Sequence, residues 1–372
     1  MLYLDNSATT YILPEVKNDM LIYLNEEYGN PSSKYYDQAI NAEKAIENAR
    51  HQISRLINAS ENELIFTSGA TESNNMVLKG VSNYYKNKRK HIITSCVEHN
   101  SILDSCEFLE ENGYKVTYLN VDKFGRINIE ELEQNITNDT CLVSINWANN
   151  EIGSINEVKS ISEICYKKNV LFHTDATQAS GKIIIDLKKL NHISFLSISA
   201  HKMHGPKGIG ILYIKSDEYG DVFPITPLLH GGGQEQGLRS GTYSVHNIVG
   251  FGKAAEIAAQ RLNSNINNLN LLEKELTQIL IQKFNDNISF NSDTENKIPG
   301  IINVRFKGIN NQLLLKKLAP YIAASSGSAC SSTNPSHVLQ AIGLNLKETR
   351  ESIRFSFSPY NHIDELKVFH DL

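Results

Sequence analysis

Residues 193–214 read ISFLSISAHKMHGPKGIGILYI. The apolar run at 193–198 predicts a buried strand, and the run at 208–214 predicts a second one. Lys202 is therefore expected in the turn between two core elements. Most lysines in such turns are exposed loop residues, but this position also suits a Schiff-base lysine, whose amine the site keeps nucleophilic. Lys207 competes for that role, although its glycine and proline neighbours are typical of a turn.

Short β-branched runs alternate with longer amphipathic runs in the chain that precedes this stretch. The β-branched runs predict strands at 64–67, 91–94, 116–119, 142–145 and 170–173. The amphipathic runs predict helices at 72–85, 101–111, 129–135 and 158–168. This alternation is typical of βα units around a mostly parallel sheet flanked by helices. The sequence therefore predicts an α/β fold.

The pattern changes near residue 250. Residues 248–284 predict one long helix, and apolar runs at 301–306 and 353–357 predict strands of a smaller α/β domain. We expect a large domain at 13–255 and a small C-terminal domain at 256–372. Residues 1–12 are expected to pack with the small domain.

Composition narrows the possible locations and partners. The formal net charge of the 372 residues is -5, which gives no general attraction to nucleic acid or to anionic membranes. No apolar run approaches the roughly 20 residues that span a bilayer, and no secretory signal precedes the first strand. The five cysteines are scattered and none forms a C-x-x-C pair, so we expect a reducing compartment, the cytoplasm, and no metal centre.

Three features lie where strands are expected to end. The turn at Ser68-Gly69-Ala70-Thr71 joins a strand to a helix, so its N–H groups suit a phosphate; an ordinary capped turn is the alternative. Asp175 follows the apolar strand 170–174 and needs a cationic partner if it is buried, unless it merely caps the next helix. With Lys202, these features match the phosphate, ring nitrogen and aldehyde carbon of pyridoxal phosphate.

Three further residues are candidates for chemistry. His99 follows a strand and opens a helix, where it could stack on a cofactor ring and move protons, or simply cap the helix. Cys330 lies among small polar residues, which suits an accessible thiolate nucleophile as well as an incidental loop cysteine. Arg354, on a predicted strand, suits two-point binding of a carboxylate.

Six motifs together resemble the cysteine desulfurases of the NifS/IscS type, within the class V aminotransferase superfamily. They are YLDNSATT at 3–10, YGNPSS at 28–33, FTSGATESNN at 66–75, NNEIG at 149–153, the lysine stretch with GGGQEQGLRSGT at 231–242, and SGSAC at 326–330. The resemblance covers nearly the whole chain. It implies the fold of pyridoxal-phosphate-dependent transferases, which is like that of aspartate aminotransferase.

The resemblance also implies roles for single residues. Lys202 would anchor the cofactor covalently, Asp175 would pair with its ring nitrogen, Gln178 would bind its ring hydroxyl and His99 would stack on the ring and shuttle protons. The cofactor's phosphate group would be held at Ala70 and Thr71, by Ser199 and His201, and by Thr242 from the other subunit of a homodimer. Asn150 and Arg354 would bind the substrate carboxylate, and Cys330 would accept sulfur.

The implied reaction converts L-cysteine to L-alanine and leaves a persulfide on Cys330 for an acceptor protein. Iron–sulfur cluster assembly, tRNA thiolation and DNA phosphorothioation are the alternative destinations of that sulfur. Two other functions compete on the same fold. One is selenocysteine lyase activity, and the other is a non-catalytic binding platform, which the intact set of Lys202, Asp175, His99 and Cys330 disfavours.

Overall fold

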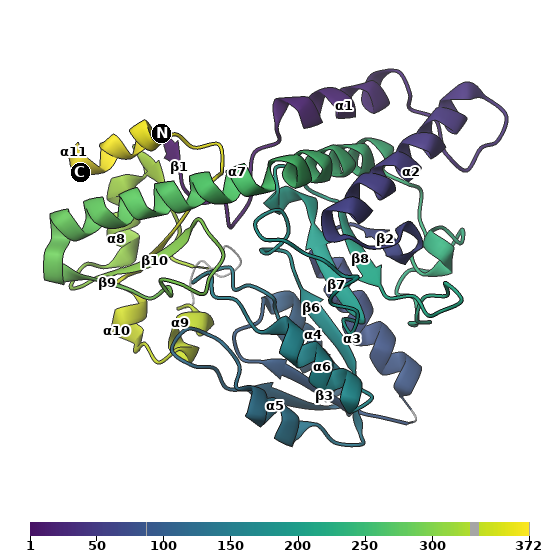
Figure 1. Ribbon diagram of the computed structural model, residues 1–372, viewed down its shortest axis with the longest axis horizontal. Coiled ribbons are helices and arrows are strands. Elements are labelled where there is room, and N and C mark those ends of the chain that lie inside the picture. The colour runs from purple at the N-terminus through teal and green to yellow at the C-terminus, as the bar shows by residue number, and fades with distance from the viewer. Residues whose placement is uncertain (87, 328–334, 372) are drawn as a thin grey trace.

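The computed structural model describes residues 1–86, 88–327 and 335–371. Its largest element is a seven-stranded sheet in the order β2-β8-β7-β6-β5-β3-β4. The strands are β2 (Leu64–Thr67), β8 (Gly210–Ile214), β7 (Phe195–Ser199), β6 (Leu171–Asp175), β5 (Thr140–Ser144), β3 (His91–Ser95) and β4 (Lys115–Leu119). β8 is antiparallel to both neighbours, and the other neighbouring pairs are parallel. The predicted mostly parallel sheet is confirmed (Figure 1).

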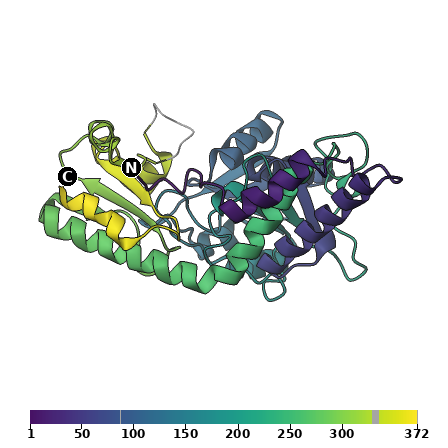
Figure 2. The same ribbon diagram turned by 90° about the horizontal axis from the view of Figure 1, so that it is seen from above.

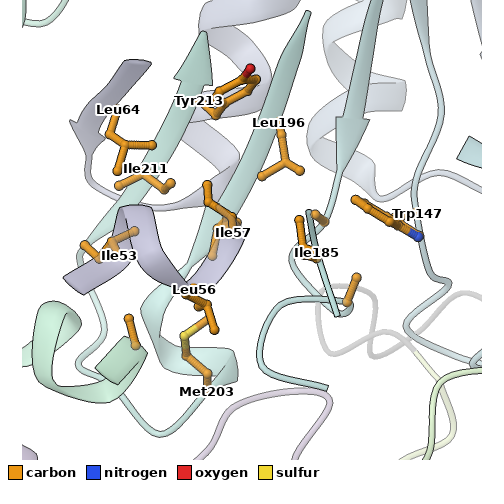
Figure 3. Packing of buried hydrophobic residues seen from close by; sticks show 14 of the residues in the cluster. Ile53, Leu56, Ile57, Leu64, Trp147, Ile185, Leu196, Met203, Ile211 and Tyr213 are labelled. Carbon is orange, nitrogen blue, oxygen red and sulfur yellow. The ribbon is translucent and has the colours of Figure 1, made fainter. Parts of the chain in front are cut away.

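Both faces of this sheet are covered by helices. Consecutive strand residues such as Ile92 and Ile93 belong to different clusters of buried side chains, as expected for strands buried on both faces. One cluster includes residues of α1 (Pro14–Asn25), α2 (Asp37–Ile57), α5 (Ile129–Asn135) and α6 (Val158–Lys167), and the other includes residues of α3 (Ala70–Tyr85) and α4 (Asn100–Glu111). Figure 3 shows Ile53 and Ile57 of α2 packed in the first cluster with Leu64 and Ile211 of the sheet.

A single long helix, α7 (Val245–Phe284), contributes to two separate cores. Its residues up to Ala258 pack with the large sheet, whereas those from Leu269 to Leu280 pack in a second core with Leu2 and Leu4. Figure 2 shows α7, in green, extending from the half of the molecule that carries both marked chain ends into the other half. The predicted spine between two lobes is therefore present.

The second core surrounds a smaller sheet in the order β12-β10-β9. Its antiparallel strands are β9 (Ile288–Phe290), β10 (Ile301–Phe306) and β12 (Ser352–Ser356). The helices in this part of the chain are α8 (Asn311–Leu318), α9 (His337–Ala341), α10 (Leu346–Thr349) and α11 (Val368–Asp371), of which α9 packs in a separate small cluster with Val97 and Ile152. β1 (Leu2–Tyr3) pairs with β11 (Ile322–Ala323) in a separate two-stranded sheet.

We propose that the chain divides into a large lobe at 13–255 and a small lobe at 256–372, with residues 1–12 assigned to the small lobe. The two separate cores and the β1–β11 pair support this division. Both marked chain ends lie beside the small sheet (Figure 1). Within the described ranges, no helix is both long enough and apolar enough to cross a membrane.

Candidate active site

A pocket of about 480 Å³ lies at the carboxyl ends of β2, β3, β5, β6 and β7. Open α/β sheets place their ligands at this edge, because the loops that follow parallel strands meet there. The sequence-predicted residues that line it are Ala70, Thr71, His99, Asn150, Asp175, Gln178, Ser199, His201, Lys202 and Arg354. The chain's first residues also contribute, through Ser7, Ala8 and Thr9.

Lys202 ends a short 3-10 helix, η2 (Ala200–Lys202), that follows β7 directly. Its Nζ donates to the backbone carbonyl of Ser7 and, at 2.7 Å, to that of Ala8. The amine is thus held inside the pocket by the amino-terminal segment. Lys207, the competing lysine, lines the same pocket.

Asp175 is the last residue of β6, whereas the sequence pattern predicted that the strand ends one residue earlier. It is 9% exposed. Asn74 Nδ2 donates to its Oδ2 at 2.8 Å, and the Thr177 backbone N–H donates to its Oδ1 at 2.9 Å. Both oxygens of this buried carboxyl therefore accept a hydrogen bond, which fixes its position at the end of the strand.

His99 caps the amino terminus of α4. The Ser101 backbone N–H donates to its Nδ1 at 3.1 Å. Because a backbone N–H can only donate, a neutral His99 carries its ring proton on Nε2. Burial lowers the pKa of His99, and the positive charge of Lys202 adds to this, although Asp175 acts in the opposite direction. The ring is therefore neutral near pH 7.

The turn between β2 and α3 has the features of a phosphate site. Gly69 caps α3 with φ 150°, and Ala70 and Thr71 are the first two helical residues, so the helix starts before the predicted Glu72. The first N–H groups of a helix lack partners within it and attract anions. A Cβ on Gly69 would lie 3.7 Å from Ser199 Oγ, which places that hydroxyl beside the turn.

His201 also lines the pocket, with Nδ1 3.1 Å from Thr9 Oγ1. Burial lowers the pKa of His201 to about 4, and the positive charges of Lys202 and Lys207 contribute. A neutral imidazole can still donate one hydrogen bond to a phosphate. Gln178 donates from Nε2 to the Ser7 carbonyl at 3.0 Å.

Arg354 comes from β12 of the small lobe and is 1% exposed. It donates from Nη1 to the Asn150 backbone carbonyl at 2.9 Å and from Nη2 to Asp5 Oδ1 at 2.7 Å. Its buried Nε has no partner in the described part of the chain. Asn150 thus contributes a carbonyl to Arg354 and lines the pocket itself.

Two predicted residues lie elsewhere. Thr242 lines a neighbouring cavity of about 120 Å³ that shares Ser68 and Gly208 with the main pocket, and the structure holds no second subunit. Cys330 lies outside the described residues. Further along the chain, Ser336 Oγ donates at 2.6 Å to Oε2 of Glu151, which lies in the turn after β5.

Two buried polar residues next to the lining residues carried no predicted role. Asn74 lies one helical turn after Ala70, a spacing that could have placed it on the same face of α3, and it donates to Asp175. Glu98, beside His99, is 1% exposed and accepts from Ser95 Oγ at 2.6 Å. Burial raises the pKa of Glu98 to about 8. No sequence signal distinguished it from a surface carboxylate.

The chemistry of the described side chains does not indicate a metal centre. Within residues 1–86, 88–327 and 335–371, no cluster of three or more His, Cys, Asp or Glu side chains is arranged to hold a metal ion. The pocket instead combines an amine, a buried carboxylate, a helix amino terminus and a guanidinium.

Comparison with known proteins gives one consistent result. Residues 2–369 match the family described as Aminotransferase class-V. The chain is 45% identical over 369 residues to "Cysteine desulfurase IscS" of Buchnera aphidicola subsp. Baizongia pistaciae, covering 98% of this chain and 90% of the relative. A solved structure of a "NIFS-LIKE PROTEIN" aligns with TM-score 0.92 and 38% identity, over 100% of this chain and 97% of that one. "SspA in complex with cysteine" aligns with TM-score 0.84 and 35% identity, over 97% of this chain and 100% of that one.

Proposed function

The chain belongs to the class-V aminotransferase family, and on that premise we propose that it is a cysteine desulfurase dependent on pyridoxal 5′-phosphate. One observation carries the proposal: an amine, a buried carboxylate and a helix amino terminus line one pocket with Arg354. The relatives named cysteine desulfurase span nearly the whole chain.

The pocket fits the cofactor. Lys202 would anchor it covalently, Asp175 would pair with the ring nitrogen, and the amino terminus of α3 with Ser199 and His201 would hold the phosphate. Thr177 Oγ1 is buried without a partner among the described residues and lines the same pocket. An orphaned buried hydroxyl is costly unless a ligand completes it, which supports a polar ligand here.

Arg354 and Asn150 would bind the substrate carboxylate. The unpartnered Nε of Arg354 supports this role, because a guanidinium binds a carboxylate best through two parallel hydrogen bonds. The pairing with Asp5 and the Asn150 carbonyl fixes the plane of the guanidinium. The amino acid would then be oriented before reaction.

When bound, the cofactor supplies covalent attachment of the amino group and withdraws the negative charge that forms at Cα. Lys202 would take up the Cα proton once its amine is released. His99 would hold or donate a proton at Nε2, because its Nδ1 is occupied by the Ser101 N–H.

Cys330 would collect the sulfur. Its thiolate would attack the substrate sulfur, so that a sulfur–sulfur bond forms and the carbon–sulfur bond breaks. The electron pair of the broken bond stays with carbon, which takes up a proton, so L-cysteine becomes L-alanine and the enzyme keeps one extra sulfur as a persulfide. An acceptor protein would remove that sulfur.

We also propose a homodimer in which Thr242 reaches the cofactor's phosphate group in the other subunit, and activity in the cytoplasm. The position of Thr242 in a cavity adjoining the main pocket supports a route to that phosphate. The free thiols of Cys96, Cys106, Cys141 and Cys165 fit a reducing compartment.

Absorbance and sulfide release test this function. The protein loaded with pyridoxal phosphate should absorb at roughly 400–430 nm, and Lys202→Ala should abolish that band. Cys330→Ser should keep the band and lose sulfide release from L-cysteine, whereas Cys96→Ser, a matched control, should retain both. A colourless wild-type protein would refute the cofactor, and sulfide release by Cys330→Ser would refute the persulfide.

A further inference from the structure

A second lysine, Lys182, is connected to Lys202 through hydrogen bonds. Lys182 Nζ donates to Gln178 Oε1 at 2.7 Å, and Gln178 Nε2 donates to the Ser7 carbonyl at 3.0 Å. The same carbonyl accepts from Lys202 Nζ. The two lysines also line one small cavity behind the main pocket.

This connection fixes the orientation of the Gln178 amide. The Ser7 carbonyl can only accept, so the amide nitrogen must face Ser7 and the amide oxygen faces the Lys182 amine, which donates to it. Gln178 therefore presents N–H groups, rather than its oxygen, on the side that carries Ser7 and lines the pocket. A ligand acceptor such as a ring oxygen would meet a donor there.

The surroundings of Lys182 are positively charged. The cationic groups that act on it are Lys202 of η2 and Arg354 of β12, and Arg354 is itself paired with Asp5. No carboxylate forms an ion pair with Lys182 in the described part of the chain. Although Lys182 is only partly buried as a residue, desolvation and the charges of Lys202 and Arg354 lower its pKa to about 7.

An ammonium group without an ionic partner repels a second ammonium group nearby. This repulsion disfavours the protonated form of both lysines. A like charge disfavours protonation of its neighbour, and acetoacetate-type Schiff-base sites use this effect to keep a lysine uncharged. Below pH about 7, a charged Lys182 would therefore favour the uncharged, nucleophilic Lys202 amine. Above that pH, Lys182 is itself uncharged and the effect disappears.

We propose that Lys182 is a positioning residue, which orients Gln178 and supplies a positive charge that favours the uncharged Lys202 amine. This role rests on the proposed function, because it concerns the reaction of Lys202 with an aldehyde. Lys182 acts through Gln178 and Lys202 and does not line the main pocket.

The rate at which apoprotein takes up pyridoxal phosphate tests the proposal. Growth of the absorbance band would be followed at about pH 6 and about pH 9, on either side of the pKa of Lys182. Lys182→Met should slow uptake about tenfold at the lower pH, because a neighbouring charge shifts protonation by about one pH unit. The variant and the wild type should converge at the higher pH.

Three further variants complete the design. Lys182→Arg keeps the charge and the donor, so it should take up cofactor at the wild-type rate at about pH 6. Lys189→Met, which removes the same charge from a side chain 85% exposed, should match the wild type throughout. Lys182→Gln repeats the test if Lys182→Met does not fold, and it should likewise be slow only at the lower pH.

The outcomes separate the two proposals. Equal slowing of Lys182→Met at both pH values, or no slowing at either, would overturn the role of Lys182 and leave the desulfurase assignment intact. Failure of the wild-type protein to develop the band would overturn the proposed function itself.

Discussion

Asp5 Oδ1 accepts a 2.7 Å hydrogen bond from Nη2 of Arg354, across 349 positions of sequence. The Arg354 side chain is 1% exposed and that of Asp5 is 22% exposed, so the pair is largely shielded from water. The guanidinium is therefore already paired with a carboxylate of the protein. Its burial depends on that partner.

Asp5→Asn should destabilise the protein. The free energy of unfolding should fall by about 3 kcal/mol, because breaking a largely buried ion pair leaves the remaining charge uncompensated. Urea titration measures this change. Asp364→Asn is the control, since Asp364 pairs with Lys367 on the surface with side chains 78% and 74% exposed, and it should leave the free energy of unfolding close to the wild-type value. Equal effects in both variants would contradict the argument.

Gly69→Ala should weaken cofactor binding. Gly69 has φ 150°, which L residues rarely adopt, so an alanine would strain the turn by about 1–3 kcal/mol and move the first N–H groups of α3. We expect the dissociation constant of pyridoxal phosphate to rise about tenfold or more, since about 1.4 kcal/mol is tenfold in affinity.

Gly113→Ala separates strain from site geometry. Gly113 also has positive φ, 80°, and a Cβ there would meet no atom within 4 Å. This variant should lose stability while cofactor affinity, measured by fluorescence or absorbance titration, stays at the wild-type value. Loss of affinity in both variants would show that general destabilisation explains the effect.

His173 should contribute to acid sensitivity. It is fully buried between β5 and β7, with Nδ1 2.8 Å from Ser144 Oγ and Nε2 3.0 Å from Ser197 Oγ. Burial lowers the pKa of His173 from 6.5 to about 4, so between these values the unfolded chain binds a proton that the folded chain does not. Stability should therefore fall as pH decreases through this range, by up to about 3 kcal/mol from this residue.

His173→Gln should lose less stability than the wild type between about pH 6.5 and about pH 4. Equilibrium unfolding by denaturant at a series of pH values measures the two slopes. His51→Gln, at a position where the side chain is 53% exposed, should follow the wild-type slope. Parallel slopes for wild type and His173→Gln would show that the residue is not buried in its neutral form.

Glu98 should lower the stability of the protein as pH rises, whereas His173 lowers it as pH falls. Burial raises the pKa of Glu98 from 4.5 to about 8, so the folded protein keeps a proton that the unfolded chain loses across this window. Stability should fall as pH rises from about 4.5 to about 8. Glu98→Gln has no proton to lose, so its stability relative to the wild type should rise over the same range, as thermal unfolding would show. A constant difference would contradict the raised pKa.

The alternation of strands and helices could be predicted because it depends on local periodicity. The runs at 64–67 and 129–135 match β2 and α5 at both ends. Helix α3, in contrast, begins at Ala70, because Gly69 supplies the turn conformation that admits helix two residues early. The positions of Lys202 and Asp175 beside the pocket could be predicted because Asp175 ends one apolar strand and Lys202 follows another.

The connections between distant residues could not be predicted from periodicity. The pairing of Arg354 with Asp5 joins opposite ends of the chain, and the hydrogen bonds of Lys182 depend on where the Ser7 carbonyl lies in space. The buried Glu98 side chain accepts hydrogen bonds from the backbone N–H and the side-chain amide of Asn146, a residue 48 positions away in the sequence. No residue spacing along the chain encodes these contacts.

The amino-terminal segment connects more of the molecule than its length suggests. Leu2 and Tyr3 pair with β11, Asp5 holds Arg354, and the carbonyls of Ser7 and Ala8 hold Lys202. A single backbone cut in this segment would thus disturb the contacts of Arg354 and of Lys202 together. The rate at which a protease cuts this segment, compared with and without pyridoxal phosphate, would therefore show whether the pocket is ordered.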